Sequence, residues 1–275
     1  MDASFADYAY ATQSVRQKMD IYLPSNKSEV NVILFIHGGG WSTGDKMSEI
    51  RGCKRCVELG YAAASMNYRM IRPIPYLPLW LQPATYKDML DDIGIAIAAL
   101  KAKLVTEGYV PKKLAITGWS SGGHLTMLYG YSRHQQSAIP IAFMATATAP
   151  TNFLDAAYRS LHSECTLTML VSVLAGQKIS IQDVVNQVSV LRDMSPLCSI
   201  VPGVPPTLMR YGAKDEMIPL SQGIAAQAAL DATNVHNDLL IYPNSGHDLD
   251  DPSDAGMSDV YMAKLQEYIS RYFSS

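Results

Sequence analysis

The most constraining feature of the sequence is a five-residue run, Val32–Ile36, in which every side chain is apolar. Such a run is typical of a strand in a parallel sheet that helices cover on both faces. Other short β-rich runs alternate along the chain with longer segments of helical periodicity. We expect strands at Met19–Leu23, Val30–Ile36, Ala62–Asn67, Leu114–Gly118, Ile141–Ala147, Thr207–Gly212 and Leu239–Tyr242.

Helical segments separate these strands. Within 86–103, Met89, Ile93, Ile97 and Leu100 recur every three or four residues and form one apolar stripe. The alternation predicts an α/β fold with a mostly parallel central sheet flanked by helices. We expect helices at Met47–Leu59, Tyr86–Lys103, Gly122–Tyr131, Ser221–Ala232 and Ser258–Phe273.

Two segments interrupt the alternation. Residues 71–83 contain four prolines and cannot form a regular element. Their apolar side chains either pack on the core or form a flap over a substrate pocket. Residues 151–202 form a long, largely helical excursion, of the kind that commonly serves as a lid. We therefore expect one domain over 1–275, with a flap at 71–83 and a lid insertion at 151–202.

Composition and charge exclude several classes of protein. Hydrophobic residues make up 48% of the chain and charged residues 17%, which argues against disorder. The net charge of −3 is spread along the chain, with no basic stripe for nucleic acid or an anionic membrane. The first residues do not resemble a signal peptide, and the apolar stretches are too short to span a bilayer. We expect a cytoplasmic protein. The sequence leaves open whether it forms a homodimer.

The cysteines do not predict a disulfide framework, because Cys53, Cys56, Cys165 and Cys198 are too few and too scattered. Cys53 and Cys56 have the spacing of a redox or zinc pair, but no second pair or nearby histidine completes a zinc site. We expect two ordinary thiols on one helix, and no metal or organic cofactor.

The strongest chemical signal is the sequence GWSSG at 118–122, which matches G-x-S-x-G where a predicted strand meets a predicted helix. Ser120 must sit there on a strained turn, and only residues without a Cβ, Gly118 and Gly122, let neighbouring backbone pass so closely. We predict that Ser120 is a nucleophile and that Ser121 contributes a free backbone N–H at the helix start. Ser121 is disfavoured as the nucleophile, because Trp119 would then hold the first glycine position.

A second signal, HGGGW at 37–41, directly follows the most apolar strand. Three successive glycines leave a row of amides that can form an oxyanion-binding concavity, although a plain glycine-rich turn has the same sequence. We expect the amides of Gly39, Gly40 and Ser121 to hold an oxyanion. The amide of Trp41 is the alternative to that of Gly39.

Together the two motifs resemble those of the α/β-hydrolase fold. Among proteins of that fold, the motifs resemble those of two groups of carboxylesterases. One is similar to hormone-sensitive lipase, and the other is similar to acetyl-xylan and feruloyl esterases. The resemblance covers nearly the whole chain, since Met19–Pro24 resembles the entry strand of that family and Asn67–Arg69 follows its next strand. It implies a catalytic triad in the order Ser, then Asp or Glu, then His.

The resemblance also indicates the acid. Asp215 lies in the turn after the predicted strand Thr207–Gly212, where residues 212–219 match the G-x-x-D-x-x-[VI]-P pattern of the family. Glu216 is the runner-up.

His247 is the predicted base, because the family places it in the loop after the last strand and Gly246 lets that loop turn. The acidic run that follows suggests either a cation site or a solvated loop, and we favour the loop. His37 is expected to orient the glycine loop by hydrogen bonding. His124 is interpreted as structural, and His134 and His162 as surface or lid residues. His236 precedes the last strand, which is the wrong end for the base.

These residues predict a serine carboxylic ester hydrolase that acts through an acyl-enzyme intermediate. Ser120 would attack the acyl carbon, His247 would carry the proton and Asp215 would orient the imidazole. The expected substrates are small esters or esters linked to carbohydrate or aryl groups. Candidate substrate contacts are Trp41, Trp119, Tyr76 and Trp80.

Three alternatives stay open from the sequence. An arylformamidase shares the glycine loop and the nucleophile turn. A serine peptidase of the prolyl-oligopeptidase kind shares the turn and the triad. A non-catalytic ligand receptor of this fold would carry an incomplete triad, and the full set Ser120, Asp215 and His247 argues against it.

Overall fold

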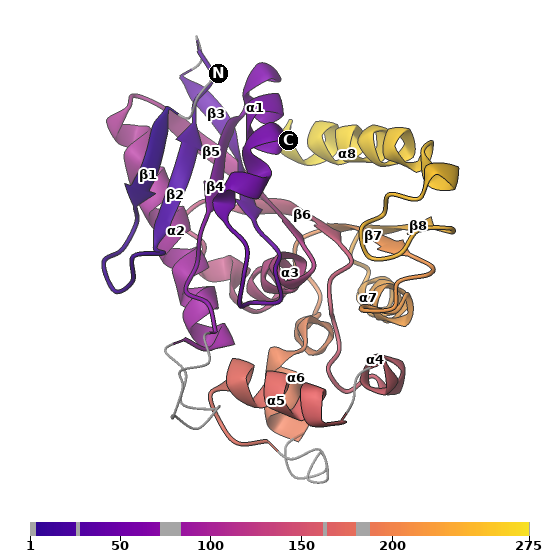
Figure 1. The fold of residues 1–275 in the computed structure, drawn as a ribbon. Coiled ribbons are helices and arrows are strands. Elements are labelled where there is room, and N and C mark those ends of the chain that lie inside the picture. The colour runs from indigo at the N-terminus through magenta and orange to yellow at the C-terminus, as the bar shows by residue number, and fades with distance from the viewer. Residues whose placement is uncertain (1–3, 26–27, 72–83, 162–163, 180–187, 275) are drawn as a thin grey trace.

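An eight-stranded sheet organises the protein in the computed structural model, which describes residues 4–25, 28–71, 84–161, 164–179 and 188–274 (Figure 1). The strand order is β1-β2-β4-β3-β5-β6-β7-β8. All neighbouring pairs from β4 across to β8 are parallel, whereas β2 is antiparallel to both β1 and β4. The strands are β1 Phe5–Ala9, β2 Lys18–Tyr22, β3 Glu29–Ile36, β4 Ala62–Met66, β5 Val110–Trp119, β6 Ile141–Ala147, β7 Thr207–Gly212 and β8 Asn237–Tyr242.

Helices cover both faces of this sheet. The helices α2, α3 and α7 contribute to the large core cluster on one face, while α1 and α8 pack on the other. Figure 1 shows α1 and α8 side by side on one side of the strands, with α7 across the sheet from α8. The helices are α1 Ile50–Glu58, α2 Tyr86–Thr106, α3 Ser121–Arg133, α4 Ala156–Ser160, α5 Glu164–Ala175, α6 Val188–Met194, α7 Ser221–Ala232 and α8 Met257–Phe273.

The mostly parallel sheet with helices on both faces confirms the predicted fold class. Every strand and helix expected from the sequence is present, with ends that differ by a few residues. The largest difference at a strand start is in β5, which begins at Val110 instead of Leu114. The segment predicted as one helix from Met47 begins with a 3-10 turn, η1, at Lys46–Glu49.

The first strand, β1, is the element that the sequence pattern did not reveal. Its five residues are partly buried or exposed, so they show no apolar run. Contacts with β2 hold it instead, including a hydrogen bond of 2.8 Å from the backbone N–H of Asp7 to Asp20 Oδ1. A register shift between Phe5 and Tyr8 further blurs the alternation.

The two interrupting segments are only partly described. Residues 72–83, which carry Tyr76 and Trp80 of the expected flap, lie outside the described residues. The described parts of 151–202 form α4, α5, α6 and the 3-10 turn η4 at Pro196–Ser199, and their role as a lid stays a prediction. Among the described residues, no helix is both long enough and apolar enough to cross a membrane.

A buried polar network ties α2 to the antiparallel side of the sheet. The Asp92 side chain is fully buried and accepts hydrogen bonds from Gln17 Nε2 at 2.7 Å and from the backbone N–H of Arg69 at 2.8 Å. The Arg69 guanidinium also pairs with Asp92 at 2.8 Å. Gln17 precedes β2 and Arg69 follows β4, so one carboxylate joins three segments.

We expect Asp92→Ala to lower the free energy of unfolding by about 3–5 kcal/mol, because it leaves the Arg69 charge without its buried partner. The neighbouring Asp91 is a matched control, since its carboxylate is exposed and pairs with Arg133 at the surface. Asp91→Ala should cost about 0–1 kcal/mol. Urea unfolding of the two variants measures both values, and equal losses would contradict this account of the network.

Candidate active site

Ser120 occupies a strained turn between the end of β5 at Trp119 and the start of α3 at Ser121. Its φ of +54° and ψ of −122° lie outside the regions that non-glycine residues ordinarily adopt. The backbone N–H of Ser120 donates to the carbonyl of Ala147 on the adjacent strand at 2.9 Å. This bond continues the pairing of β5 with β6 up to the strained residue and helps to hold the turn.

Both glycines of the G-x-S-x-G motif are required by close backbone contacts. A Cβ on Gly122 would collide with the carbonyl oxygen of Ile36 at the end of β3, and one on Gly118 would collide with the carbonyl oxygen of Gly122. Both obstacles are backbone atoms, which cannot rotate away as a side chain can. The expectation that these positions must lack a Cβ is confirmed.

We expect Gly122→Ala to lower the free energy of unfolding by about 1–3 kcal/mol or more, because the strand end must shift to admit the methyl group. Gly94 is the matched control: it lies inside α2, where a new Cβ would meet only Tyr129 at ordinary contact distance. Gly94→Ala should raise stability by about 0.5–1 kcal/mol through its higher helix propensity. Thermal and urea unfolding distinguish the two outcomes, and a Gly122→Ala protein as stable as wild type would refute the clash.

His247 and Asp215 form a hydrogen-bonded pair at the same edge of the sheet. Asp215 follows β7, His247 follows β8, and His247 Nδ1 lies 2.8 Å from Asp215 Oδ2. The other carboxylate oxygen accepts from the backbone N–H groups of Met217 and Ile218, each at 2.8 Å. The Asp215 side chain is fully buried, so it is oriented by bonds at both oxygens. Because a carboxylate accepts the Nδ1 proton, His247 Nε2 is left as a proton acceptor.

The loop that carries His247 is held by Asp254. This carboxylate accepts hydrogen bonds from the backbone N–H of Asn244 at 2.8 Å and from Ser245 Oγ at 2.7 Å. We expected the acidic run after His247 to be a solvated loop. Asp254 departs from this expectation, because it is only 4% exposed. No group of three or more metal-ligating side chains occurs among the described residues, here or elsewhere.

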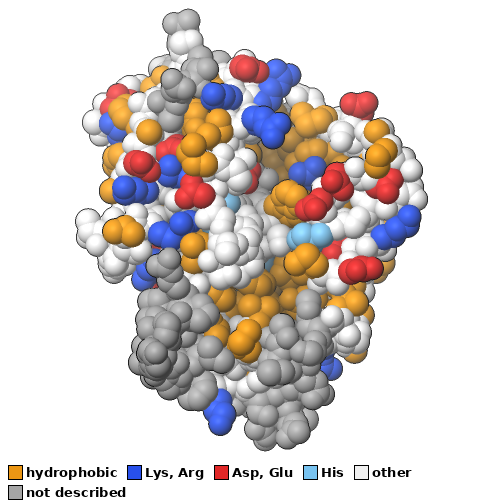
Figure 2. All heavy atoms as spheres, in the orientation of Figure 1, with side chains coloured by type: hydrophobic (Ala, Val, Ile, Leu, Met, Phe, Trp, Pro, Cys, Tyr) orange, Lys and Arg blue, Asp and Glu red, His pale blue; other side chains and the backbone are white. Residues whose placement is uncertain are grey.

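Ser120 and His247 line one open cavity of about 640 Å³, together with Trp119 and the glycine loop. The side chain of Asp215 lies behind His247 in the pair described above. The Trp119 ring lies 6.1 Å from the His247 ring, and its Nε1–H donates to Thr148 Oγ1 at 2.6 Å. Figure 2 shows histidine atoms at the surface near the middle of one face, beside hollows floored by hydrophobic side chains.

The glycine loop lies directly against the serine turn. A Cβ on Gly38 would come within 2.9 Å of the carbonyl oxygen of Trp119 and 3.5 Å of Ser120 Cβ. The carbonyl of Gly39 accepts hydrogen bonds from Thr43, through its backbone N–H at 2.9 Å and its hydroxyl at 2.8 Å. With φ values of +114° and +57°, Gly39 and Gly40 adopt backbone that favours glycine. Within the described residues their N–H groups donate to no other backbone group, so they are free to face the cavity.

His37 is a buried part of this loop's support. Its ring stacks on Tyr68 with centroids 4.4 Å apart, and Nδ1 lies 2.7 Å from the carbonyl oxygen of Gly38. Its Nε2 lies 3.3 Å from the guanidinium of Arg16. Nδ1 therefore donates and Nε2 accepts, in a neutral ring whose pKa is lowered, chiefly by burial. The expected hydrogen bond between His37 and the glycine loop is confirmed.

Trp41 and His124 form a buried contact between the glycine loop and the excursion over 151–202. Trp41 Nε1–H donates to His124 Nδ1 at 3.1 Å, and His124 Nε2 lies 2.8 Å from the carbonyl oxygen of Met194 at the end of α6. Phe153 packs on both rings. Trp41 is 4% exposed, so its side chain lies in the core, and its expected contact with substrate stays a prediction. Trp119, by contrast, is 40% exposed and lines the cavity.

Acid should destabilise the protein through His124. Burial lowers the pKa of His124 to about 4, whereas an unfolded histidine titrates near ~6.5. Between these values the unfolded chain binds a proton that the folded chain does not. The free energy of unfolding should therefore fall by about 1.4 kcal/mol for each pH unit on acidification from this residue alone.

Urea unfolding between about pH 7 and pH 4.5 tests this slope. We expect His124→Gln to be less stable than wild type near neutral pH but to show a shallower acid decline. Phe153→Leu is the control, because it loosens the same packing without removing a titratable group and should keep the steep decline. A His124→Gln protein with the wild-type slope would contradict the assignment.

The cysteine pair lies on α1, as expected. Cys53 is buried and Cys56 is half-buried, and neither forms a disulfide. Burial raises the pKa of the Cys56 thiol to about 12 and that of Cys53 above its ordinary range. Both are neutral thiols and therefore poor nucleophiles near neutral pH.

Comparison with known families and curated proteins identifies several relatives. The model of the BD-FAE family matches residues 19–230. The probable carboxylic ester hydrolase LipM and the esterase LipQ, both from Mycobacterium tuberculosis, are 26% and 27% identical over 80% of this chain. The acylamino-acid-releasing enzyme of Arabidopsis thaliana is 27% identical over 84% of this chain. The chain spans about half the length of LipM and LipQ (49% and 50%) and 30% of the plant enzyme.

Solved structures share the fold over most of the chain. A truncated carbohydrate esterase from gut microbiota superposes with a TM-score of 0.72 at 18% identity, covering 94% of this chain and 95% of that one. Esterase B from Lactobacillus rhamnosis gives a TM-score of 0.70 at 18% identity, covering 97% of this chain and 86% of the other. At these identities the likeness shows the arrangement of the sheet and helices and nothing finer.

Proposed function

Because the chain belongs to the BD-FAE family, we propose that it is a serine hydrolase that cleaves carboxylic esters through an acyl-enzyme intermediate. One observation carries the proposal: the strained Ser120 shares a cavity with His247, whose Nδ1 is bonded to the buried carboxylate of Asp215. Ester hydrolysis needs a serine nucleophile beside an oriented imidazole, and this arrangement supplies both.

In the proposed reaction, His247 Nε2 takes the proton of the Ser120 hydroxyl as its oxygen attacks the acyl carbon. The resulting imidazolium carries its positive charge next to the Asp215 carboxylate, which stabilises it and keeps the ring in one orientation. His247 then gives the proton to the leaving alcohol, and the acyl group stays on Ser120. Water, activated by the same imidazole, releases the acid and restores the serine.

The negative charge on the substrate oxygen needs donors that are in place before the reaction. The amides of Gly39, Gly40 and Ser121 are proposed for this role, with that of Trp41 as the alternative to Gly39. The N–H of Ser121 lies in the first turn of α3, where helical N–H groups have no intrahelical partner and the helix dipole favours negative charge. Fixed donors of this kind stabilise the transition state without reorganising during the reaction.

For substrates we propose small esters and esters linked to carbohydrate or aryl groups. Two relatives are described as ester hydrolases and a structural neighbour as a carbohydrate esterase, which supports this choice of classes. Trp119 is the proposed aromatic contact for the substrate, because its exposed ring borders Ser120 in the cavity.

Replacing the nucleophile should abolish turnover without unfolding the protein. We expect Ser120→Ala to lower kcat for p-nitrophenyl acetate by at least about 10⁴-fold, with an unchanged unfolding midpoint. Ser121→Ala is the matched control, because its hydroxyl is buried and its proposed contribution is a backbone amide that alanine retains. It should keep kcat within about tenfold of wild type. Equal losses in two folded variants would refute Ser120 as the nucleophile.

A second candidate function is the release of acylated amino acids, the activity named for the plant relative. The same nucleophile, base and oxyanion donors would serve an amide bond. An N-acetylalanine p-nitroanilide assayed beside p-nitrophenyl acetate separates the two, because a peptidase would cleave the anilide with a kcat/KM comparable to that of the ester.

A further inference from the structure

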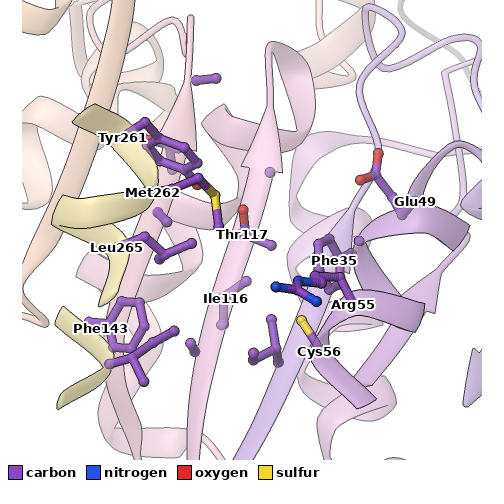
Figure 3. Close-up of a pocket in the computed structure, with 18 of the residues that line it drawn as sticks. Phe35, Glu49, Arg55, Cys56, Ile116, Thr117, Phe143, Tyr261, Met262 and Leu265 are labelled. Carbon is purple, nitrogen blue, oxygen red and sulfur yellow. The ribbon is translucent and has the colours of Figure 1, made fainter. Parts of the chain in front are cut away.

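A second cavity, of about 300 Å³, lies between α1 and α8 on the sheet face opposite α2 and α3 (Figure 3). The cavity lies where α1 packs on β2, β3 and β4 and α8 packs on β6 and β7, so that the carboxyl-end part of β5 around Thr117 lies between the two helices. Small side chains of β5 and β6 form part of the floor, namely Ala115, Thr117, Ala145 and Ala147, beside the larger Phe143. A volume of this size is at the lower end of the range for small-molecule sites.

The walls of the cavity are mostly apolar. Figure 3 shows Met262 and Leu265 reaching from α8 towards Thr117, with Phe35 and Cys56 on the side of α1. Natural interiors contain few spaces larger than a water molecule, because unfilled apolar surface loses dispersion contacts. A partly enclosed apolar space on this scale is therefore more suited to a ligand than to packing.

Three charged side chains also line the cavity, and they come from both of its sides. The Arg210 guanidinium lies 3.9 Å from the centre of the Tyr261 ring, and its Nε is buried with no hydrogen-bond partner among the described residues. Glu49 and Arg55 complete the charged side chains around the cavity. A mostly apolar lining with a few polar groups is the usual composition of a small-molecule site.

This cavity adjoins the one that contains Ser120. Glu49 and Trp119 line both cavities, so they form the boundary between them. Thr117, on the floor of the second cavity, lies in β5 three positions before Ser120. At the rise of a strand, three positions correspond to about 10 Å. A group attached to the carbon under attack could therefore enter the second cavity only by extending past Trp119.

We propose that the cavity between α1 and α8 binds the apolar part of the ester substrate, a hydrocarbon chain or ring that extends from Ser120 past Trp119. This assignment rests on the proposed ester hydrolysis and adds the substrate class: esters with an extended apolar group on the acyl or the alcohol side. An acetyl group does not reach the cavity, so short esters do not use it.

Activity across two series of esters tests the assignment. One series is p-nitrophenyl esters with acyl chains from acetate to decanoate, and the other is acetate esters of alcohols of rising length. In the series that uses the cavity, wild-type kcat/KM should rise by about fourfold for each methylene that enters. The other series should show no such rise, which identifies the side of the ester that is bound.

Leu265→Trp fills the cavity from α8, and Val260→Trp places the same side chain on the exposed face of that helix. We expect Leu265→Trp to lower kcat/KM for the longest effective ester by about tenfold or more and to leave the acetate within about twofold. Val260→Trp should match wild type on every ester. Leu265→Ala enlarges the cavity and should shift the substrate preference towards esters with longer or bulkier groups. This variant tests the assignment if Leu265→Trp does not fold.

A loss that is equal for short and long esters in folded Leu265 variants would overturn the assignment and mark the residue as packing only. Long-chain selectivity that all of these variants retain would also overturn it. A wild-type protein that hydrolyses short esters without any dependence on chain length rejects this inference but not the proposed function. A wild-type protein that hydrolyses no ester rejects the proposed function and this inference with it.

Discussion

The structure depends on one strained residue at the carboxyl end of the inner strand β5. Ser120 adopts a φ of +54° at the point where β5 ends and α3 begins, and the chain must reverse direction there without side chains at Gly118 or Gly122. Such a conformation costs on the order of 1–3 kcal/mol and persists only where the surroundings determine it. The surroundings here are β3 and β6, which pair with β5 on either side as far as Gly118 and Trp119. Pairing on both sides of β5 thus supports the strained turn.

The parallel sheet also explains why the other groups gather around Ser120. The carboxyl ends of parallel strands share one edge, and there the register pairs Ile36 with Gly118 and Gly212 with Tyr242. The glycine loop follows β3, the turn of Ser120 follows β5, and the loops of Asp215 and His247 follow β7 and β8. Short loops on a rigid edge therefore need little further ordering to bring these four segments together, although they are distant in sequence.

Much of this arrangement could be predicted from the sequence because its signals are local. A G-x-S-x-G motif at a strand end predicts the tight turn that carries the serine. Apolar runs such as Val32–Ile36 predict a strand that is buried on both faces of the sheet. The strand β1 lacked such a signal, because its side chains are partly exposed and its order comes from β2.

The contacts that the sequence did not reveal join residues far apart in the chain. Trp41 was expected to meet substrate, yet its indole donates to His124, 83 positions away, and that histidine contacts the end of α6. Asp254 accepts a hydrogen bond from the backbone of the His247 loop. The sequence did not predict this bond, because Asp254 belongs to a run of acidic residues that resembled a solvated loop. The cavity over β5 depends on which strands α1 and α8 cover, so it becomes visible only when the helices have been placed on the sheet.

The central claim is that Ser120 is a nucleophile activated by His247. Reaction with an alkyl fluorophosphonate, followed by intact-protein and peptide mass spectrometry, tests this most directly, because the reagent traps an activated serine covalently. The account predicts a single adduct on the peptide containing Ser120, formed rapidly in wild type and lost in a folded His247→Ala protein. A stable adduct on a different residue, or labelling of Ser120 at the same rate without His247, would contradict it.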